Sequence, residues 1–172
     1  LLLPIYTRYL TTEDYGIVSS MQVLSTILLI IFTFAIEKSC YRLYFDYKTN
    51  KEKKEFLGTI FLSIIAIAIL FLLLLFLLSE YVVLLYQSIP FYPFYSFIIL
   101  TAFFYVFSLI PKLYYQINEQ ASKFINLSIL QFIISTIITL WFVIEKSEGA
   151  YGMLKGRMIA NMVLAPLFLY LS

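Results

Sequence analysis

A stripe of hydrogen-bonding side chains runs through the first long apolar stretch of the sequence. Its members are separated by three, four, seven and four residues, and these spacings place them on one face of an α-helix. Such a face either packs against neighbouring helices through hydrogen bonds or lines a water-filled lumen, and the spacing allows both interpretations. The stripe consists of Ser19, Gln22, Thr26, Thr33 and Glu37.

A second stripe of the same kind lies in a later apolar stretch. Ser128, Gln131, Ser135 and Thr139 follow one another at spacings of three, four and four residues, again on one helical face. Asn126 precedes this stripe and lies off to one side. Each stripe therefore gives an apolar segment one face that we expect to be turned away from lipid.

Arg157 is a charged residue far from the nearest predicted helix end. It follows Gly149, where the last helix is predicted to open, by eight residues. At a rise of about 1.5 Å per residue it lies roughly 12 Å along that helix. A cation at that depth is unfavourable without a partner, so we expect Arg157 to face the bundle interior with Asn161 one turn later. Lys155 lies nearer the surface, where its long stem can carry the ammonium to the head groups.

Several kinds of chemistry are excluded or disfavoured by what the sequence lacks. It contains no histidine, which excludes a histidine base or metal ligand, and its single cysteine, Cys40, can form neither an internal disulfide nor a zinc site. We expect no metal or cofactor. No glycine-rich phosphate loop is present, and the acidic residues fall mostly at predicted helix ends, with Glu37 as the one at membrane depth. We therefore do not expect an enzyme.

The composition explains where these polar residues must lie. Hydrophobic residues make up 62% of the 172 residues and charged residues 13%, with a mean hydropathy of +0.93. A soluble domain averages roughly 45–50% apolar and about 25% charged residues. Apolar runs of about 18 residues or more are typical of membrane spans, and several occur here. The predicted fold is an all-α polytopic membrane bundle of about six transmembrane helices.

Local signals place the boundaries of these helices. Thr11 and Asp14 have the spacing of a capping box, which predicts a helix start near Thr12. Pro93 suits the first turn of the fourth helix. The first segment is too short to span a bilayer, so we expect it to start upstream. The predicted helices cover residues 1–10, 12–42, 54–79, 93–120, 121–144 and 150–172.

The basic residues predict the orientation of the bundle. If the polar 42–55 loop is cytoplasmic and the loops alternate from there, eight of the twelve basic residues lie on the inner side. These are Lys38, Arg42, Lys48, Lys51, Lys53, Lys54, Lys112 and Lys123, and the outer four are Arg8, Lys146, Lys155 and Arg157.

Two turns and one helix end carry a resemblance to a known family. The motifs are Pro4, Arg8-Tyr9-Leu10-Thr11 and Glu13-Asp14-Tyr15-Gly16, then Arg42-Leu43-Tyr44-Phe45-Asp46 before a basic loop, and Gly149-Ala150-Tyr151-Gly152. With them the chain resembles the Wzx-type O-antigen flippases, the polysaccharide-exporter branch of the multidrug/oligosaccharidyl-lipid/polysaccharide exporter superfamily. The resemblance covers essentially the whole chain in helix order and loop length. The sequence departs from the family pattern at Gln116 and Asn118, where a basic residue often stands.

The resemblance implies an architecture and a function. Family members have about twelve or more spans in two lobes, and residues 1–172 would form most of the N-terminal lobe, with the C-terminal lobe as partner. The implied activity is translocation of an undecaprenyl-pyrophosphate-linked oligosaccharide across the bacterial inner membrane, with no role for nucleic acid. The cations available to an anionic head are Arg8, Lys38, Arg42, Lys155 and Arg157. The polar lumen residues are Gln22, Thr26, Glu37, Asn126, Gln131, Ser135 and Asn161.

Other interpretations remain open at this stage. A cation-coupled small-molecule antiporter of the same superfamily would need a buried carboxylate, for which Glu37 is the candidate. A membrane glycosyltransferase would need a large polar loop elsewhere. The basic 42–55 loop is either a solvated connection or a polybasic contact for anionic membrane lipids.

Overall fold

The computed structural model describes residues 6, 8–82, 84 and 89–171, except for the side chains of Glu37, Lys38 and Val82. Every regular element in this part of the chain is a helix, which confirms the predicted all-α class. The elements are α2 (Thr12–Thr33), α3 (Ile36–Tyr44), α4 (Asn50–Leu77), α5 (Ser79–Val82), η2 (Phe91–Tyr95), α6 (Ser96–Ile117), α7 (Ala121–Leu140), η3 (Trp141–Glu145) and α8 (Gly149–Leu171).

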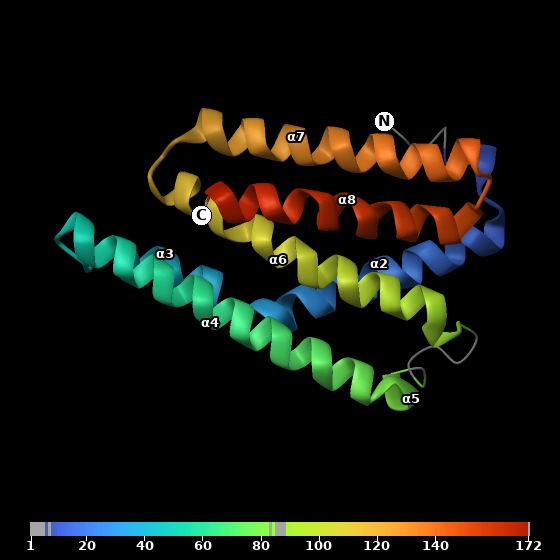
Figure 1. The fold of residues 1–172 in the computed structure, drawn as a ribbon, viewed down its shortest axis with the longest axis horizontal. Coiled ribbons are helices and arrows are strands. Elements are labelled where there is room, and N and C mark those ends of the chain that lie inside the picture. The colour runs from blue at the N-terminus through green and yellow to red at the C-terminus, as the bar shows by residue number, and fades with distance from the viewer. Residues whose placement is uncertain (1–5, 7, 83, 85–88, 172) are drawn as a thin grey trace.

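Within the described residues, five helices are long and apolar enough to cross a membrane. They are α2, α4, η2 with α6, α7 with η3, and α8. Their long axes run in roughly the same direction, with α8 between α6 and α7 and with α4 at the opposite edge (Figure 1). The first predicted segment, 1–10, lies largely outside the described residues, so five observed spans agree with about six predicted ones.

The segment predicted as one helix over 12–42 consists of two. Helix α2 ends at Thr33, and the next two residues, Phe34 and Ala35, have φ angles of 50° and 52°. A right-handed helix cannot continue through left-handed residues, so α3 begins afresh at Ile36. Neither residue is glycine or proline, and the break therefore has no signal in the sequence.

Helix α2 begins with the predicted capping box. The Thr11 hydroxyl accepts a hydrogen bond from the Asp14 amide at 3.1 Å, and Asp14 Oδ2 accepts one from the Thr11 amide at 3.0 Å. The other carboxylate oxygen, Oδ1, accepts from the Ala150 amide at 2.9 Å. Asp14 thus satisfies otherwise unpaired amides at the starts of two helices, α2 and α8, and ties them together at one end of the bundle.

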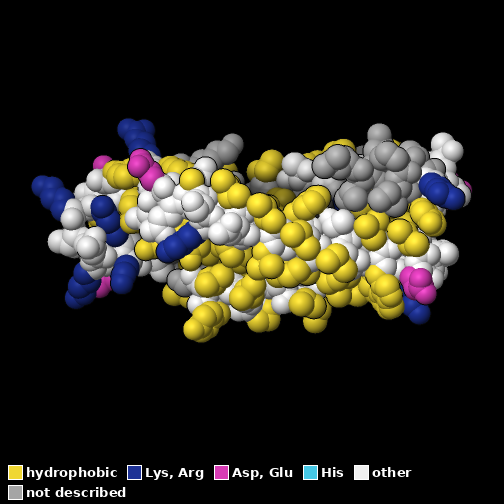
Figure 2. All heavy atoms as spheres, turned by 90° about the horizontal axis from the view of Figure 1, so that it is seen from above, with side chains coloured by type: hydrophobic (Ala, Val, Ile, Leu, Met, Phe, Trp, Pro, Cys, Tyr) yellow, Lys and Arg dark blue, Asp and Glu magenta, His cyan; other side chains and the backbone are white. Residues whose placement is uncertain are grey.

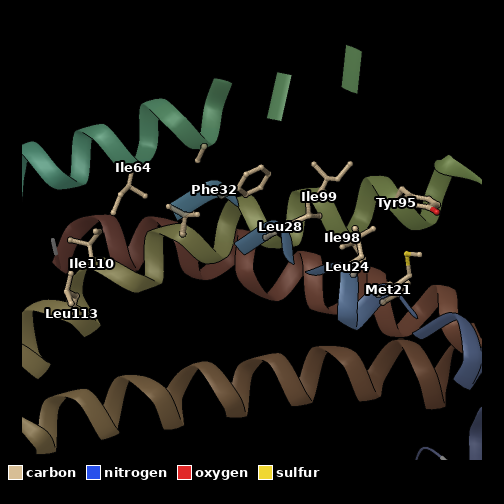
Figure 3. Close-up of a cluster of buried hydrophobic side chains, with 14 of the residues drawn as sticks. Met21, Leu24, Leu28, Phe32, Ile64, Tyr95, Ile98, Ile99, Ile110 and Leu113 are labelled. Atoms are coloured by element: carbon tan, nitrogen blue, oxygen red, sulfur yellow. The ribbon is translucent and has the colours of Figure 1, made fainter. Parts of the chain in front are cut away.

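One side of α2 and α6 packs against α4 through buried apolar side chains. We call this contact the α4 seam (Figure 3). The isoleucine and phenylalanine side chains there have almost no exposed surface. They are in van der Waals contact with neighbouring helices and not with lipid. The seam consists of Phe32 of α2, Ile60, Ile64 and Ala68 of α4, and Ile99 of α6, within a hydrophobic cluster that also holds Met21, Leu24 and Leu28 of α2 and Ile98 and Ala102 of α6.

The rest of α4 is turned outward. Its most apolar window has a mean hydropathy of 3.3, yet only 11% of that window is buried within the bundle. Leu70, Leu73 and Leu77 are among its exposed side chains. Figure 2 shows the hydrophobic band in the middle of the molecule, with basic side chains gathered mainly at the end where α4 begins. This distribution suits a helix that faces acyl chains, with its charged start at the head groups.

On the other side of the bundle, α8 packs closely against α7 and η3 through small residues. A Cβ atom on Gly156 would lie 2.7 Å from Thr139 Cα, and one on Gly152 would lie 3.0 Å from the Phe142 carbonyl oxygen. Ala160, one turn further along, is fully buried. Small residues at i, i+4 and i+8 are a common way for membrane helices to approach each other.

Candidate functional site

A cavity of about 460 Å³ lies between α2, α6, α7 and α8. Its wall combines hydroxyl, amide and guanidinium groups with a few apolar side chains, whereas the α4 seam on the far side of α2 and α6 is apolar. The lining residues are Tyr6, Gln22, Ser25, Leu29, Ile98, Thr101, Ala102, Tyr105, Ser128, Gln131, Phe132, Ser135, Thr136, Thr139, Arg157 and Asn161.

The close packing of α8 on α7 explains how Arg157 and Asn161 reach this cavity. Gly156 and Ala160 occupy the tight contact, so the next residue after each projects beside it toward the space between the helices. Asn161 is buried, and its amide nitrogen donates to the Arg157 carbonyl at 3.0 Å. The Arg157 guanidinium and the buried Asn161 amide are therefore one turn apart on the same face of α8.

A chain of hydrogen bonds crosses the cavity from α2 to α6. The Arg157 guanidinium donates to the Gln22 side-chain oxygen, and the Gln131 amide nitrogen donates to Asn161 Oδ1 at 3.0 Å. The other end of the Gln131 amide accepts from the ammonium of Lys112. Asn161 in turn donates to the Arg157 carbonyl, so neutral amides connect the Lys112 ammonium to the backbone of the residue whose guanidinium meets Gln22.

Neither cation has a carboxylate partner among the described residues. The ion pairs in this part of the chain join Lys51 to Glu55 and Lys155 to Glu148. Lys112 instead lies 5.6 Å from the centroid of the Tyr105 ring. No acidic residue is among the described residues that line the cavity. Two partly buried cations, Arg157 and Lys112, with only amide and aromatic-ring partners favour the binding of an anionic ligand.

The α7 stripe supplies the hydroxyl groups of the wall. Ser128, Gln131, Ser135 and Thr139 all line the cavity, together with Thr136. The Thr139 hydroxyl is buried and has no hydrogen-bond partner among the described residues. A hydroxyl in that position can donate to or accept from a polyhydroxylated ligand.

A second hollow of about 380 Å³ adjoins the cavity. Tyr105 and Ser128 line both spaces, and Lys112 and Gln116 line the second. Because α6 ends at Ile117 and α7 begins at Ala121, this hollow lies toward the end of the bundle where α4 begins (Figure 1). The polar space therefore extends from Arg157 toward that end.

Five of the residues predicted from sequence line the cavity: Gln22, Gln131, Ser135, Arg157 and Asn161. The others that the structure describes do not line it. Arg8, Arg42 and Asn126 are exposed, and the Thr26 hydroxyl donates to the Gln22 carbonyl at 3.1 Å. Lys155 pairs with Glu148 at 3.3 Å and lies over the Phe142 and Tyr151 rings. The side chains of Glu37 and Lys38 lie outside the described part of the chain.

Sequence reasoning missed the contribution of α6. Thr101, Tyr105 and Lys112 form a third polar stripe with spacings of four and seven residues, the same pattern that revealed the stripe of α2. Lys112 counted only as an inner-side charge in the orientation. A lysine inside a predicted span is unfavourable without an interior partner, and this rule points to the cavity.

Comparison with known proteins identifies the family. Residues 5–172 match the family described as Polysaccharide biosynthesis protein. Because this match covers nearly all of the sequence, the chain belongs to that family. No curated protein and no solved structure matches it. The chain is therefore a multi-pass membrane protein of the polysaccharide biosynthesis protein family.

Proposed function

We propose that this member of the polysaccharide biosynthesis protein family is a flippase for undecaprenyl-pyrophosphate-linked oligosaccharides in the bacterial inner membrane. The observation that carries the proposal is the cavity between α2, α6, α7 and α8, which combines a guanidinium with amides and hydroxyls inside an apolar bundle. Membrane proteins seldom retain such groups in their spans without a function for them. The proposed substrate has an anionic head and many hydroxyls, which match both parts of the wall.

Arg157 is the proposed pyrophosphate ligand. A guanidinium offers two parallel donors to a phosphate group, and charge-assisted bonds of this kind are about twice as strong as neutral ones. Its present partner, Gln22, is a neutral amide that can release it without leaving an unpaired charge. The sugars would meet the α7 hydroxyls and the amides of Gln131 and Asn161, which both donate and accept.

Lys112 is the proposed second contact along the path. It lines the adjoining hollow and is linked through Gln131 and Asn161 to the backbone carbonyl of Arg157. If the basic end of the bundle is cytoplasmic, as the positive-inside rule predicts, a head group from the inner leaflet would meet Lys112 before Arg157. We further propose that a second lobe of the full-length protein completes the cavity wall, since alternating access needs two bodies that move against each other.

The antiporter alternative receives less support from the geometry. Cation coupling calls for a carboxylate on the transport path, and the described lining residues include none. Arg157 and the amide chain favour an anionic cargo over a cationic drug. A polysaccharide family is also more consistent with a lipid-linked sugar than with a drug.

Substitution of Arg157 in the full-length protein tests the proposal. Arg157→Ala should reduce polysaccharide export by roughly tenfold or more, because charge-assisted hydrogen bonds typically contribute about 1.5–3 kcal/mol. Arg157→Lys keeps the charge but loses the paired donors, so it should fall between wild type and alanine. Export is measured as surface polysaccharide per inserted protein in cells whose only flippase is the variant.

A matched control separates charge in the cavity from charge on the protein. Lys146→Ala also removes one positive charge, but Lys146 is exposed and lies over the Trp141 ring outside the cavity. Its export should equal that of wild type. Normal export by Arg157→Ala at normal insertion would reject the role of the cavity in transport.

A further inference from the structure

A groove separate from the polar cavity lies at the basic end of the bundle. It has a volume of about 430 Å³ and lies between the start of α4, the last turns of α6 and the end of α8. Its walls are mostly apolar, with Phe61, Pro111 and Leu171 among them, while Lys54 and Tyr114 supply its polar groups. None of its lining residues belongs to the cavity.

Gly58 keeps the groove open. It lies on α4 within the groove, and a Cβ atom built on it would meet no other atom within 4 Å. The position is exposed although it lies in the most apolar of the five spanning helices. A chain of methylene groups can lie along the helix here, between Gly58 and the apolar wall.

Lys54 lines the groove and is available to pair with an anion. Among the described lysines of the first turns of α4, Lys51 pairs with Glu55 at 3.8 Å and Lys53 lies 5.0 Å from the centroid of the Tyr44 ring. Lys54 is exposed and has neither kind of partner among the described residues. Lys48 adds a further positive charge in the preceding loop. Tyr114, on the opposite wall, is an amphipathic residue of the kind enriched at head-group depth.

We propose that this groove binds one anionic phospholipid of the cytoplasmic leaflet. Its phosphate would lie at Lys54, with the Tyr114 hydroxyl as a second donor, and one acyl chain would pass over Gly58 between α4 and α6. Charge complementarity selects the occupant, because a zwitterionic lipid would bring a second positive charge to the basic end and an apolar peptide would leave Lys54 unpaired. The inference is independent of the proposed transport cargo.

Native mass spectrometry of the full-length protein tests this directly. The protein is reconstituted in vesicles of equal parts phosphatidylglycerol and phosphatidylcholine, extracted gently, and the retained lipids are counted. Wild type should retain one phosphatidylglycerol in preference to phosphatidylcholine. Lys54→Gln should reduce that preference about fivefold, as expected for one basic residue near an anionic lipid. Gly58→Leu should abolish retention by filling the groove.

Two controls make the result specific. Lys51→Gln removes the same charge one turn earlier, from a side chain that is 86% exposed and already paired, and should retain the lipid as wild type does. Gly16→Leu adds the same side chain at another open helical glycine, on α2, and should also retain it. Equal losses in Lys51→Gln and Lys54→Gln would overturn the proposal in favour of a diffuse polybasic attraction. Undiminished retention in Gly58→Leu would show that no chain lies in the groove.

Discussion

Within α2 and within α6, the two faces differ in polarity more than one helix differs from the other. Both helices have a mean hydropathy of 1.9 in their most apolar window, so neither is marked as polar by composition. One face of each meets α4 through the apolar α4 seam, and the other carries the groups of the cavity. The chemistry of the bundle is therefore divided by helix face and not by helix.

The comparison shows what stabilises each region. In a bilayer, burying an apolar side chain between helices gains packing contacts but little hydrophobic free energy, since lipid is equally apolar. The seam should therefore contribute modestly per residue and tolerate changes of similar volume. The cavity holds polar groups that lipid cannot solvate, so each must face a protein partner or water.

We expect the stability of the protein to be most sensitive to substitutions in the close contact between α7 and α8. Gly156→Leu places a side chain where even a Cβ atom lies 2.7 Å from Thr139 Cα, so α7 and α8 must separate. We expect a loss of about 3 kcal/mol or more, at or beyond the upper end of overpacking effects. Thermal unfolding in detergent micelles measures it. Gly16→Leu, at an open position, serves as the control, and similar losses in both variants would contradict the close contact.

A pair of substitutions should separate the seam from the cavity. Ile64→Ala in the seam should cost about 1–2 kcal/mol of stability, because the packing loss remains even where the transfer free energy is small. Transport per folded molecule should stay normal. Gln131→Leu breaks the link between Lys112 and Asn161 and should reduce transport roughly tenfold.

Gln131→Leu should lower the stability less than Ile64→Ala does. Water in the cavity can solvate Lys112 and Asn161 when Gln131 is replaced. Melting temperature and export, measured on the same two preparations, give the comparison. Full export by Gln131→Leu, or a loss of export in folded Ile64→Ala, would remove the distinction between the two regions.

Asp14 should affect both regions equally, because it joins the starts of α2 and α8. Asp14→Ala removes two caps and should cost roughly 2 kcal/mol, at about 1 kcal/mol for each cap. Asp14→Asn keeps one acceptor oxygen and should cost about half as much. Chemical unfolding measures the loss. A larger defect in transport than in folded protein would indicate that Asp14 acts in the cycle itself.

Much of this arrangement could be predicted from spacing alone. The stripes of α2 and α7 placed Gln22, Gln131 and Ser135 on inward faces, and the cost of a deep cation placed Arg157 and Asn161 with them. These residues line the cavity, as expected where a polar group in a span must face protein or water.

The remaining features depend on tertiary contacts that spacing does not contain. The break at Phe34 and Ala35 has no glycine or proline to mark it, and Lys155 turns to Glu148 because α8 presents Gly156 to α7. The second role of Asp14, at Ala150, joins residues 136 positions apart. Gly152, Gly156 and Ala160 did carry a usable signal, since small residues at intervals of four predict close helix packing.

Thiol chemistry can compare the seam and the cavity in one protein. Cys40 of α3 is fully buried in the same hydrophobic cluster as the seam, and burial raises the pKa of its thiol to about 11. Because only the thiolate reacts, Cys40 should stay unlabelled at neutral pH and begin to react only as the pH approaches that pKa. A cysteine introduced at Ser135, in the cavity wall, should react with a small anionic thiol reagent at neutral pH.

Protection of that introduced cysteine by substrate is the most direct test of whether the cavity lies on the path of a lipid-linked sugar. Labelling of Ser135→Cys in the full-length protein is compared between membranes that contain lipid-linked oligosaccharide and membranes from cells that cannot start its synthesis. If the cavity lies on the path of the substrate, labelling of Ser135→Cys should be slower when the substrate is present. This protection should be lost when Arg157→Ala is added. Equal labelling rates in the two membranes would contradict it.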